Sequence, residues 1–151
     1  MIPTKRKILL CRVLLVLNLA LIWGNSLLNG AESGQMSGGI MAFVMELLRI
    51  PESASELVHL IIRKLAHLTE FACLAAQISW HLRLVKEKRV HQILLAVLLT
   101  MAAALVDETI QLFTPDRGPS LTDVWIDTLG AALGMTAVQL GYHLKKKKND
   151  T

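Results

Sequence analysis

Four apolar segments, each close to the length needed to cross a bilayer, constrain the fold of this 151-residue chain more than any other feature. A helix needs about 20 apolar residues to span the hydrocarbon core, where unpaired backbone groups find no water. Apolar residues make up 53% of the chain, above the roughly 45–50% of ordinary soluble domains. The sequence therefore predicts one all-α domain over residues 1–151, an integral membrane four-helix bundle with spans at about 8–28, 65–84, 93–113 and 121–144.

The basic residues predict the orientation of this bundle. Twelve of the 16 Lys and Arg residues fall into three groups that alternating spans place on one side, which the positive-inside rule makes cytoplasmic. Both termini are therefore predicted to be cytoplasmic, and the net charge of +4 reflects topology and not nucleic-acid binding. The lysine tail is placed to contact anionic lipid. The three groups are Lys5, Arg6, Lys7 and Arg12; Arg83, Lys86, Lys88 and Arg89; and Lys145, Lys146, Lys147 and Lys148.

Three further features of the sequence allow specific predictions. The N-terminal segment also resembles a signal peptide, but its run is long and Leu28 precedes a poor cleavage site, so we expect an uncleaved helix. Residues 29–51 are expected to form a loop rich in Gly and Ser, with a short apolar patch at 40–50 that could lie on the membrane surface. Ser53 and Glu56 have the spacing of a capping box and predict the start of the next helix.

The two cysteines lie inside apolar runs, without the spacing of a zinc site or a redox motif. We expect both Cys11 and Cys73 to be buried free thiols.

The predicted topology brings polar residues from all four spans to the outer side of the membrane. Charged groups within membrane-spanning segments are energetically costly unless they are paired, hydrated or required for function. These residues therefore form a candidate functional site. None of them lies in the inner half of the predicted bundle. The candidates are Asn25, Ser26, Lys64, His67, Glu70, Asp107, Glu108, Gln111, Arg117, Asp123 and Asp127.

Helical spacing refines this site. Lys64, His67 and Phe71 share one stripe of the second span, with Glu70 at its flank, and Asp107 and Gln111 lie one turn apart on the third. On the fourth span, a single face carries two carboxylates and then small residues, which allow close helix packing in lipid. Its members are Asp123, Asp127, Gly130, Gly134, Ala137 and Gly141.

These residues lie in motifs that resemble the VanZ family: KLAHLTEF at 64–71, DETIQLFTPDR at 107–117 and SLTDVWIDTLG at 120–130 followed by Gly134. Residues 23–27, WGNSL, and the stretch 33–37 are also similar. Two positions differ, with Asp116 where glycine is common and Asp127 where asparagine is frequent. The resemblance implies a multi-pass protein of the bacterial cytoplasmic membrane. It also implies a link to low-level resistance to the glycopeptide teicoplanin, the phenotype of the family's namesake.

One functional hypothesis is a hydrolase or transferase that acts on a membrane lipid or a lipid-linked precursor of the cell envelope. His67 and Glu70, one helical turn apart, could act as a base and an orienting acid. Lys64 and Arg117 could clamp a phosphate group.

The carboxylates open a second route to chemistry. Asp107 and Asp123 are candidates for catalysis, and together with Asp127 they could hold a divalent ion. Oxygen ligands of this kind suit Mg²⁺ or Mn²⁺ best.

Non-catalytic hypotheses use the same residues. In a structural network that fixes helix packing, Arg117 would neutralise Asp107 or Asp123, and Lys64 would pair with Glu108. In a binding protein, the site would hold a lipid or glycopeptide headgroup without chemistry. A small transporter is a further alternative, although four helices are few unless the chain oligomerises, and the sequence leaves the oligomeric state open.

Overall fold

The computed structural model describes residues 4–118 and 120–149, without the side chains of residues 30–37, 146 and 149. Within these residues the chain is all-helical, with no strand. Its five α-helices are joined by short turns, and one 3-10 turn, η1, precedes α3. The elements are α1 (Thr4–Leu27), α2 (Gly30–Leu48), η1 (Glu52–Ala54), α3 (Ser55–Leu84), α4 (Arg89–Leu112) and α5 (Leu121–Asn149).

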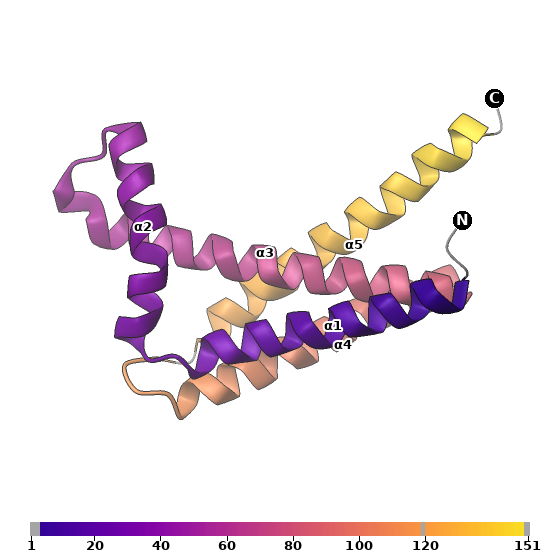
Figure 1. The fold of residues 1–151 in the computed structure, drawn as a ribbon, viewed down its shortest axis with the longest axis horizontal. Coiled ribbons are helices and arrows are strands. Elements are labelled where there is room, and N and C mark those ends of the chain that lie inside the picture. The colour runs from indigo at the N-terminus through magenta and orange to yellow at the C-terminus, as the bar shows by residue number, and fades with distance from the viewer. Residues whose placement is uncertain (1–3, 119, 150–151) are drawn as a thin grey trace.

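Helix α3 is the centre of the molecule, because it contacts each of the other four α-helices. Figure 1 shows α1, α3 and α4 running along the longest axis, while α5 crosses them and diverges, and α2 lies across one end. Both termini lie at one end of the bundle, which we call the terminal end. The α4–α5 turn at residues 113–118 lies at the opposite end, which we call the turn end.

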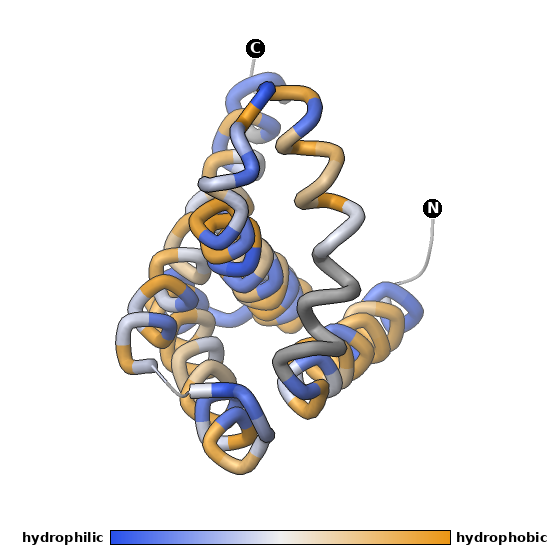
Figure 2. Tube along the Cα trace, turned by 90° about the vertical axis from the view of Figure 1, so that its left-hand side faces the viewer, coloured by the Kyte–Doolittle hydropathy of each residue, from blue (hydrophilic) through white to orange (hydrophobic). Residues whose placement is uncertain are grey.

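Two of the described helices, α1 and α4, are long and apolar enough to cross a membrane. Only 11% of the apolar stretch of α1 and 33% of that of α4 are buried within the chain, whereas the core helix of a soluble protein would be mostly buried. Figure 2 shows hydrophobic residues along each of the long helices. Helices α3 and α5 contain more charged residues, and they supply much of the polar site described below.

The turn between α4 and α5 follows from local sequence. Pro115 disfavours helical backbone in the residue before it, and α4 ends at Leu112. Asp116 then has a positive φ of 58°, a conformation that glycine adopts without strain and that aspartate tolerates better than most residues. This backbone explains why glycine is common at this position in the family that the sequence resembles.

The prediction of a loop over residues 29–51 is wrong, because most of this segment forms α2. The glycines near its start have low helix propensity. However, the apolar second half of α2 packs on α3 and buries Met45, so tertiary packing outweighs the local preference.

The predicted capping box does not form. Ala54 is the N-cap of α3, and it makes no side-chain capping hydrogen bond. The η1 turn, Glu52–Ala54, leads directly into α3, so Ser53 lies inside that turn and not at the helix boundary.

The prediction for the cysteines holds only in part. Both thiols are free, and Cys11 is buried, but Cys73 is exposed on α3. Burial of Cys73 was inferred from its apolar neighbours in sequence, which do not say which face of the helix meets another helix.

Helices α3 and α5 approach closely at two glycines, as the spacing predicted. A Cβ atom added at Gly130 would collide with the backbone carbonyl oxygen of Leu68, and one at Gly134 would collide with that of Ala72. At Gly141 the same atom would have no described atom within 4 Å outside its own chain neighbourhood, so the close contact ends before this residue. The crossing fixes the part of α5 that holds Asp127 against α3.

The half of the bundle nearer the terminal end also contains polar contacts, which the sequence analysis did not foresee. Asn18 donates to Gln77 over 3.2 Å. Gln139 donates to Ser79 over 3.4 Å and to Gln92 over 3.3 Å. These groups are neutral amides and a hydroxyl, so they link helices without placing charge there.

Candidate functional site

The eleven predicted site residues converge at the turn end of the bundle. Ten of them contact another member of the predicted set, and the remaining one, Glu108, accepts a hydrogen bond from the Ser120 backbone. The members come from α1, α3, α4, α5 and the α4–α5 turn, so the convergence depends on the tertiary fold.

Asp107 is the centre of the buried part of the site. Its side chain is fully buried and accepts hydrogen bonds from Ser26 Oγ over 2.6 Å and from Gln111 Nε2 over 2.8 Å. The Gln111 amide also lies 3.3 Å from Ser26 Oγ. Asp107 and Gln111 lie one turn apart on α4, and Ser26 approaches from α1. These contacts satisfy both oxygens of the carboxylate and join α1 to α4.

The α4–α5 turn is bound to the end of α1 through backbone carbonyls. Thr114 Oγ1 donates to the Ser26 carbonyl over 2.9 Å, and Arg117 Nη2 donates to the Asn25 carbonyl over 3.1 Å. The pKa of the Arg117 guanidinium is lowered below its ordinary value. Burial is the main cause, and the nearby positive charge of Arg63 is the second. Arg117 therefore holds the turn in place, and it makes no ion pair with Asp107 or Asp123 among the described residues.

Glu70 does not orient His67, contrary to the prediction. Its Oε1 accepts a hydrogen bond from Asn25 Nδ2 over 3.1 Å. Spacing along α3 placed the two side chains one turn apart, but α1 and α5 approach different sides of α3. Glu70 therefore turns toward α1.

The partner of His67 is Asp127 on α5. His67 Nδ1 lies 3.8 Å from Asp127 Oδ1, and the imidazole stacks on the Phe71 ring with centroids 6.4 Å apart. Asp127 is fully buried, and within the described chain neither of its oxygens has a hydrogen-bond partner. His67 Nδ1 is likewise buried without a hydrogen bond. A histidine and a carboxyl group thus face each other with unused hydrogen-bonding capacity.

Lys64 pairs with Asp123, not with Glu108 as the structural hypothesis held. Glu108 Oε2 instead accepts a hydrogen bond from the Ser120 backbone N–H over 2.6 Å. This contact places a carboxylate at the N-terminus of α5, where the helix dipole favours negative charge.

A pocket of about 200 Å³ lies between α3 and α5 beside these residues. Two cations, Arg63 and Lys64, line it, with Asp123 as the one carboxylate and His67 as the one imidazole. Arg63 Nη2 donates to Gln111 Oε1 over 3.3 Å, which joins the pocket to the Asp107 network. The described residues that line it are Leu60, Arg63, Lys64, His67, Gly118, Asp123 and Ile126.

Sequence reasoning missed three members of the site: Arg63, Thr114 and Ser120. Arg63 lies just before the span predicted at about 65–84, but it is one helical turn before His67 and so shares its face. Thr114 and Ser120 flank the turn and act partly through backbone groups, for which side-chain spacing gives no signal.

The three carboxylates considered for a divalent ion, Asp107, Asp123 and Asp127, do not gather into one group among the described residues. The described residues contain no group of three or more His, Cys, Asp or Glu side chains placed to hold a metal ion. Asp107 is satisfied by Ser26 and Gln111, and Asp123 is paired with Lys64, so the three predicted carboxylates have separate partners. The predicted phosphate clamp is also changed, because Arg63, and not Arg117, lines the pocket beside Lys64.

The profile of one protein family, described as VanZ/LLP1, matches residues 11–142. The matched region runs from within α1 to within α5 and includes all eleven site residues. No curated protein and no solved structure matches the chain significantly.

Proposed function

The chain belongs to the VanZ/LLP1 family, and on that basis we propose that it is a multi-pass protein of the bacterial cytoplasmic membrane. We further propose that its α3–α5 pocket binds the anionic headgroup of a lipid or a lipid-linked precursor of the cell envelope. Both termini are proposed to face the cytoplasm, which places the pocket at the outer leaflet. Binding of such a precursor would account for an effect on teicoplanin susceptibility.

The composition of the pocket carries the proposal. Arg63 and Lys64 line it against the single carboxylate of Asp123, so the charges of these residues sum to a positive value. An Arg guanidinium presents a fork of N–H donors that matches phosphate oxygens, and Lys adds a point charge. An anion in the pocket would compete with Asp123 for the Lys64 ammonium. A phosphate or diphosphate group is the ligand that this set of donors fits best.

Acid–base chemistry on the bound headgroup is the second candidate function, and the His67–Asp127 pair favours it. His67 lines the pocket and has Asp127 behind it, the arrangement in which a carboxyl group orients an imidazole and stabilises its protonated form. His67 could then accept the proton of a hydroxyl group or water molecule that attacks the ligand. This hypothesis needs the anion site, whereas the anion site does not need the chemistry.

The proposed orientation is supported by the arrangement of the ends. Both termini lie at the terminal end in Figure 1, and the Arg83 guanidinium lies over the Tyr142 ring, which places the end of α3 level with the lysine-rich end of α5. Three basic groups on one side satisfy the positive-inside rule.

Arg63→Gln tests the proposal most directly, because Arg63 makes a single hydrogen bond among the described residues, to Gln111, while removal of Lys64 would leave Asp123 unpaired. The ligands are a polyprenyl diphosphate and the polyprenol with the same tail and no phosphate. We expect the diphosphate to raise the melting temperature of the purified wild-type protein and the polyprenol to have no such effect.

Loss of one charge-assisted contact of about 1.5–3 kcal/mol should weaken diphosphate binding by Arg63→Gln roughly 10–100-fold. Lys88→Gln, an exposed cation remote from the pocket, is the matched control and should bind as wild type does. Equal affinity of wild type and Arg63→Gln, or equal stabilisation by diphosphate and polyprenol, would contradict the anion site.

A further inference from the structure

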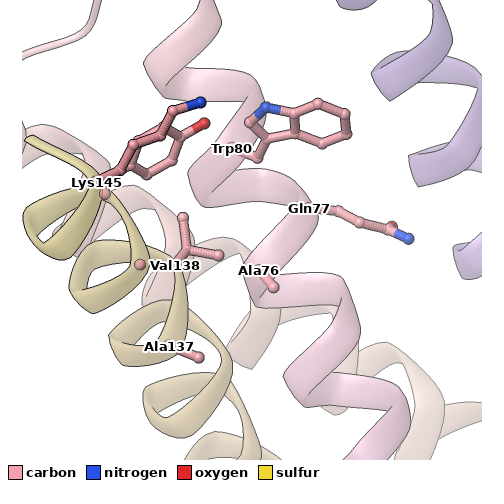
Figure 3. A pocket seen from close by; sticks show the side chains of 8 residues that line it. Ala76, Gln77, Trp80, Ala137, Val138 and Lys145 are labelled. Carbon is pink, nitrogen blue, oxygen red and sulfur yellow. The ribbon is translucent and has the colours of Figure 1, made fainter. Parts of the chain in front are cut away.

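Helices α3 and α5 leave a second, apolar groove that begins beside their close contact and extends toward the terminal end. The C-terminal part of α5 diverges from α3, as Figure 1 shows. Two overlapping cavities, of about 370 Å³ and about 450 Å³, share Ala76, Ala137 and Val138 and so form one continuous groove. Figure 3 shows these three small side chains between the two helices, with Trp80 and Lys145 on either side of the opening.

The groove has the length of one lipid leaflet. Its α3 wall extends from Leu68 to Trp80, which at 1.5 Å per residue is about 18 Å. The hydrocarbon core of a bilayer is about 30 Å thick, so one leaflet measures about 15 Å. A shallow apolar groove of this length could hold an extended acyl chain along the helix surface.

The terminal end of the groove has the side chains of a membrane interface. Trp80, Tyr142 and Lys145 line it, and Arg83 stacks over the Tyr142 ring at 3.6 Å from its centroid. Aromatic rings gather at the headgroup level of bilayers, and basic pockets between helices on the cytoplasmic side bind phosphate-bearing headgroups. The positive charge thus lies at the end of the groove where a lipid headgroup would be.

We propose that this groove is a specific site for an anionic phospholipid of the inner leaflet, with one acyl chain between α3 and α5 and the phosphate at Lys145. A second copy of the chain is a poorer occupant, because a twofold contact through this groove would bring Lys145 toward its own symmetry mate. The site depends on the proposed membrane orientation but not on the ligand of the outer pocket, so a failure of diphosphate binding there would not contradict it.

Trp80 provides a local probe of the groove. In a Trp23→Phe, Trp125→Phe background it is the only tryptophan of the chain. The full-length protein is reconstituted in dioleoylphosphatidylcholine vesicles that contain, at equal mole fractions, either phosphatidylglycerol or phosphatidylcholine with dibrominated acyl chains. We expect phosphatidylglycerol to quench Trp80 several-fold more than phosphatidylcholine does.

Two pairs of variants separate the groove from general attraction to the lysine tail. Lys145→Gln should abolish the preference for phosphatidylglycerol, while Lys147→Gln should retain it. Ala137→Phe, which fills the groove, should reduce quenching by both lipids, while Leu140→Phe, at an exposed position of the same helix, should not.

Three results would overturn the proposal. The first is equal quenching of Trp80 by the two lipids, and the second is a preference for phosphatidylglycerol that survives both Lys145→Gln and Ala137→Phe. The third is protection of Trp80 from both lipids together with cross-links between chains, which would mean that a second copy of the chain covers the groove. Native mass spectrometry of the wild-type chain, exchanged into the same two lipids without bromine, provides a check that needs no substitution. It should retain phosphatidylglycerol and lose that retention in Lys145→Gln.

Discussion

The Asp127 carboxyl group is fully buried, and neither of its oxygens accepts a hydrogen bond from any residue in the described part of the chain. A buried polar group without a partner destabilises a fold by about 1–3 kcal/mol, and a charged one by more. Asp107, equally buried, has its hydrogen bonds satisfied by Ser26 and Gln111. Two carboxyl groups on adjacent helices therefore have opposite relations to stability, and this contrast can be tested.

Asp127→Asn should leave the melting temperature of the purified protein unchanged or raise it, because the substitution keeps the shape and removes the potential charge. Asp107→Asn should lower it, because one of two charge-assisted hydrogen bonds is lost, at a cost of about 1.5–3 kcal/mol. The measurement is thermal unfolding in one detergent. If Asp127 serves His67, Asp127→Asn should also abolish the proposed effect on teicoplanin susceptibility at matched protein levels.

An equal loss of stability in both variants would mean that Asp127 is as well satisfied as Asp107, contrary to the geometry. A stable Asp127→Asn protein with full activity in cells would leave the anion pocket intact as a proposal and remove the acid–base role of the His67–Asp127 pair.

For single residues, the sequence predicted which side chains gather at the site but not which of them pair. Spacing along one helix predicts neighbours on that helix, so it correctly placed His67 and Phe71 on one face and Asp107 beside Gln111. Pairs across helices depend on rotation and crossing angle. Lys64 therefore meets Asp123 instead of Glu108, a difference that no single-helix pattern contains.

Among the helices, the α3–α5 contact depends on two glycines. Gly130→Leu and Gly134→Leu should each prevent normal folding, because even a Cβ atom would collide with an α3 carbonyl, and overpacking typically costs about 1–3 kcal/mol or more. Gly141→Leu is the matched control on the same face, where the added atom meets open space. Protein level in the membrane fraction and melting temperature in detergent measure the effect.

Normal accumulation and stability of Gly134→Leu would show that α5 does not approach α3 as closely as described. A loss in Gly141→Leu equal to that in Gly134→Leu would show that the defect comes from leucine on this face and not from the crossing.

Helix boundaries were predictable to within a few residues where a continuous apolar run fills most of the element, as in α1 and α4. The prediction failed for α2, because its first half has the composition of a loop and its helical state depends on packing of the second half against α3. Local propensity is a weak determinant when a neighbouring element provides an apolar surface.

For the molecule as a whole, the apolar segments and the family resemblance predicted the helical class, and the arrangement of charge predicted that the site residues would meet at one end. The sequence did not predict the neutral contacts of Gln77, Gln92 and Gln139 near the terminal end. Neutral amides inside apolar segments do not follow a simple pattern, since they can face lipid headgroups, a neighbouring helix or each other. The divergence of α5 that opens the lipid groove is likewise a property of helix crossing and not of sequence spacing.

Single cysteines can test the predicted orientation of the bundle in the membrane with little perturbation of the fold. In a Cys11→Ser, Cys73→Ser background, Glu52→Cys lies just after α2 and Glu87→Cys lies in the α3–α4 turn, and both positions are exposed. A membrane-impermeant maleimide should label Glu52→Cys in intact cells and Glu87→Cys only after lysis, because the basic groups keep the α3–α4 turn cytoplasmic. Labelling of both in lysed cells is the control for reactivity.

The opposite pattern in intact cells would move the anion pocket to the cytoplasmic leaflet and the lipid groove to the outer one, so both proposed ligands would have to be reconsidered. Labelling of both positions in intact cells would exclude an odd number of membrane crossings between them, and with it the assignment of α3 as a span.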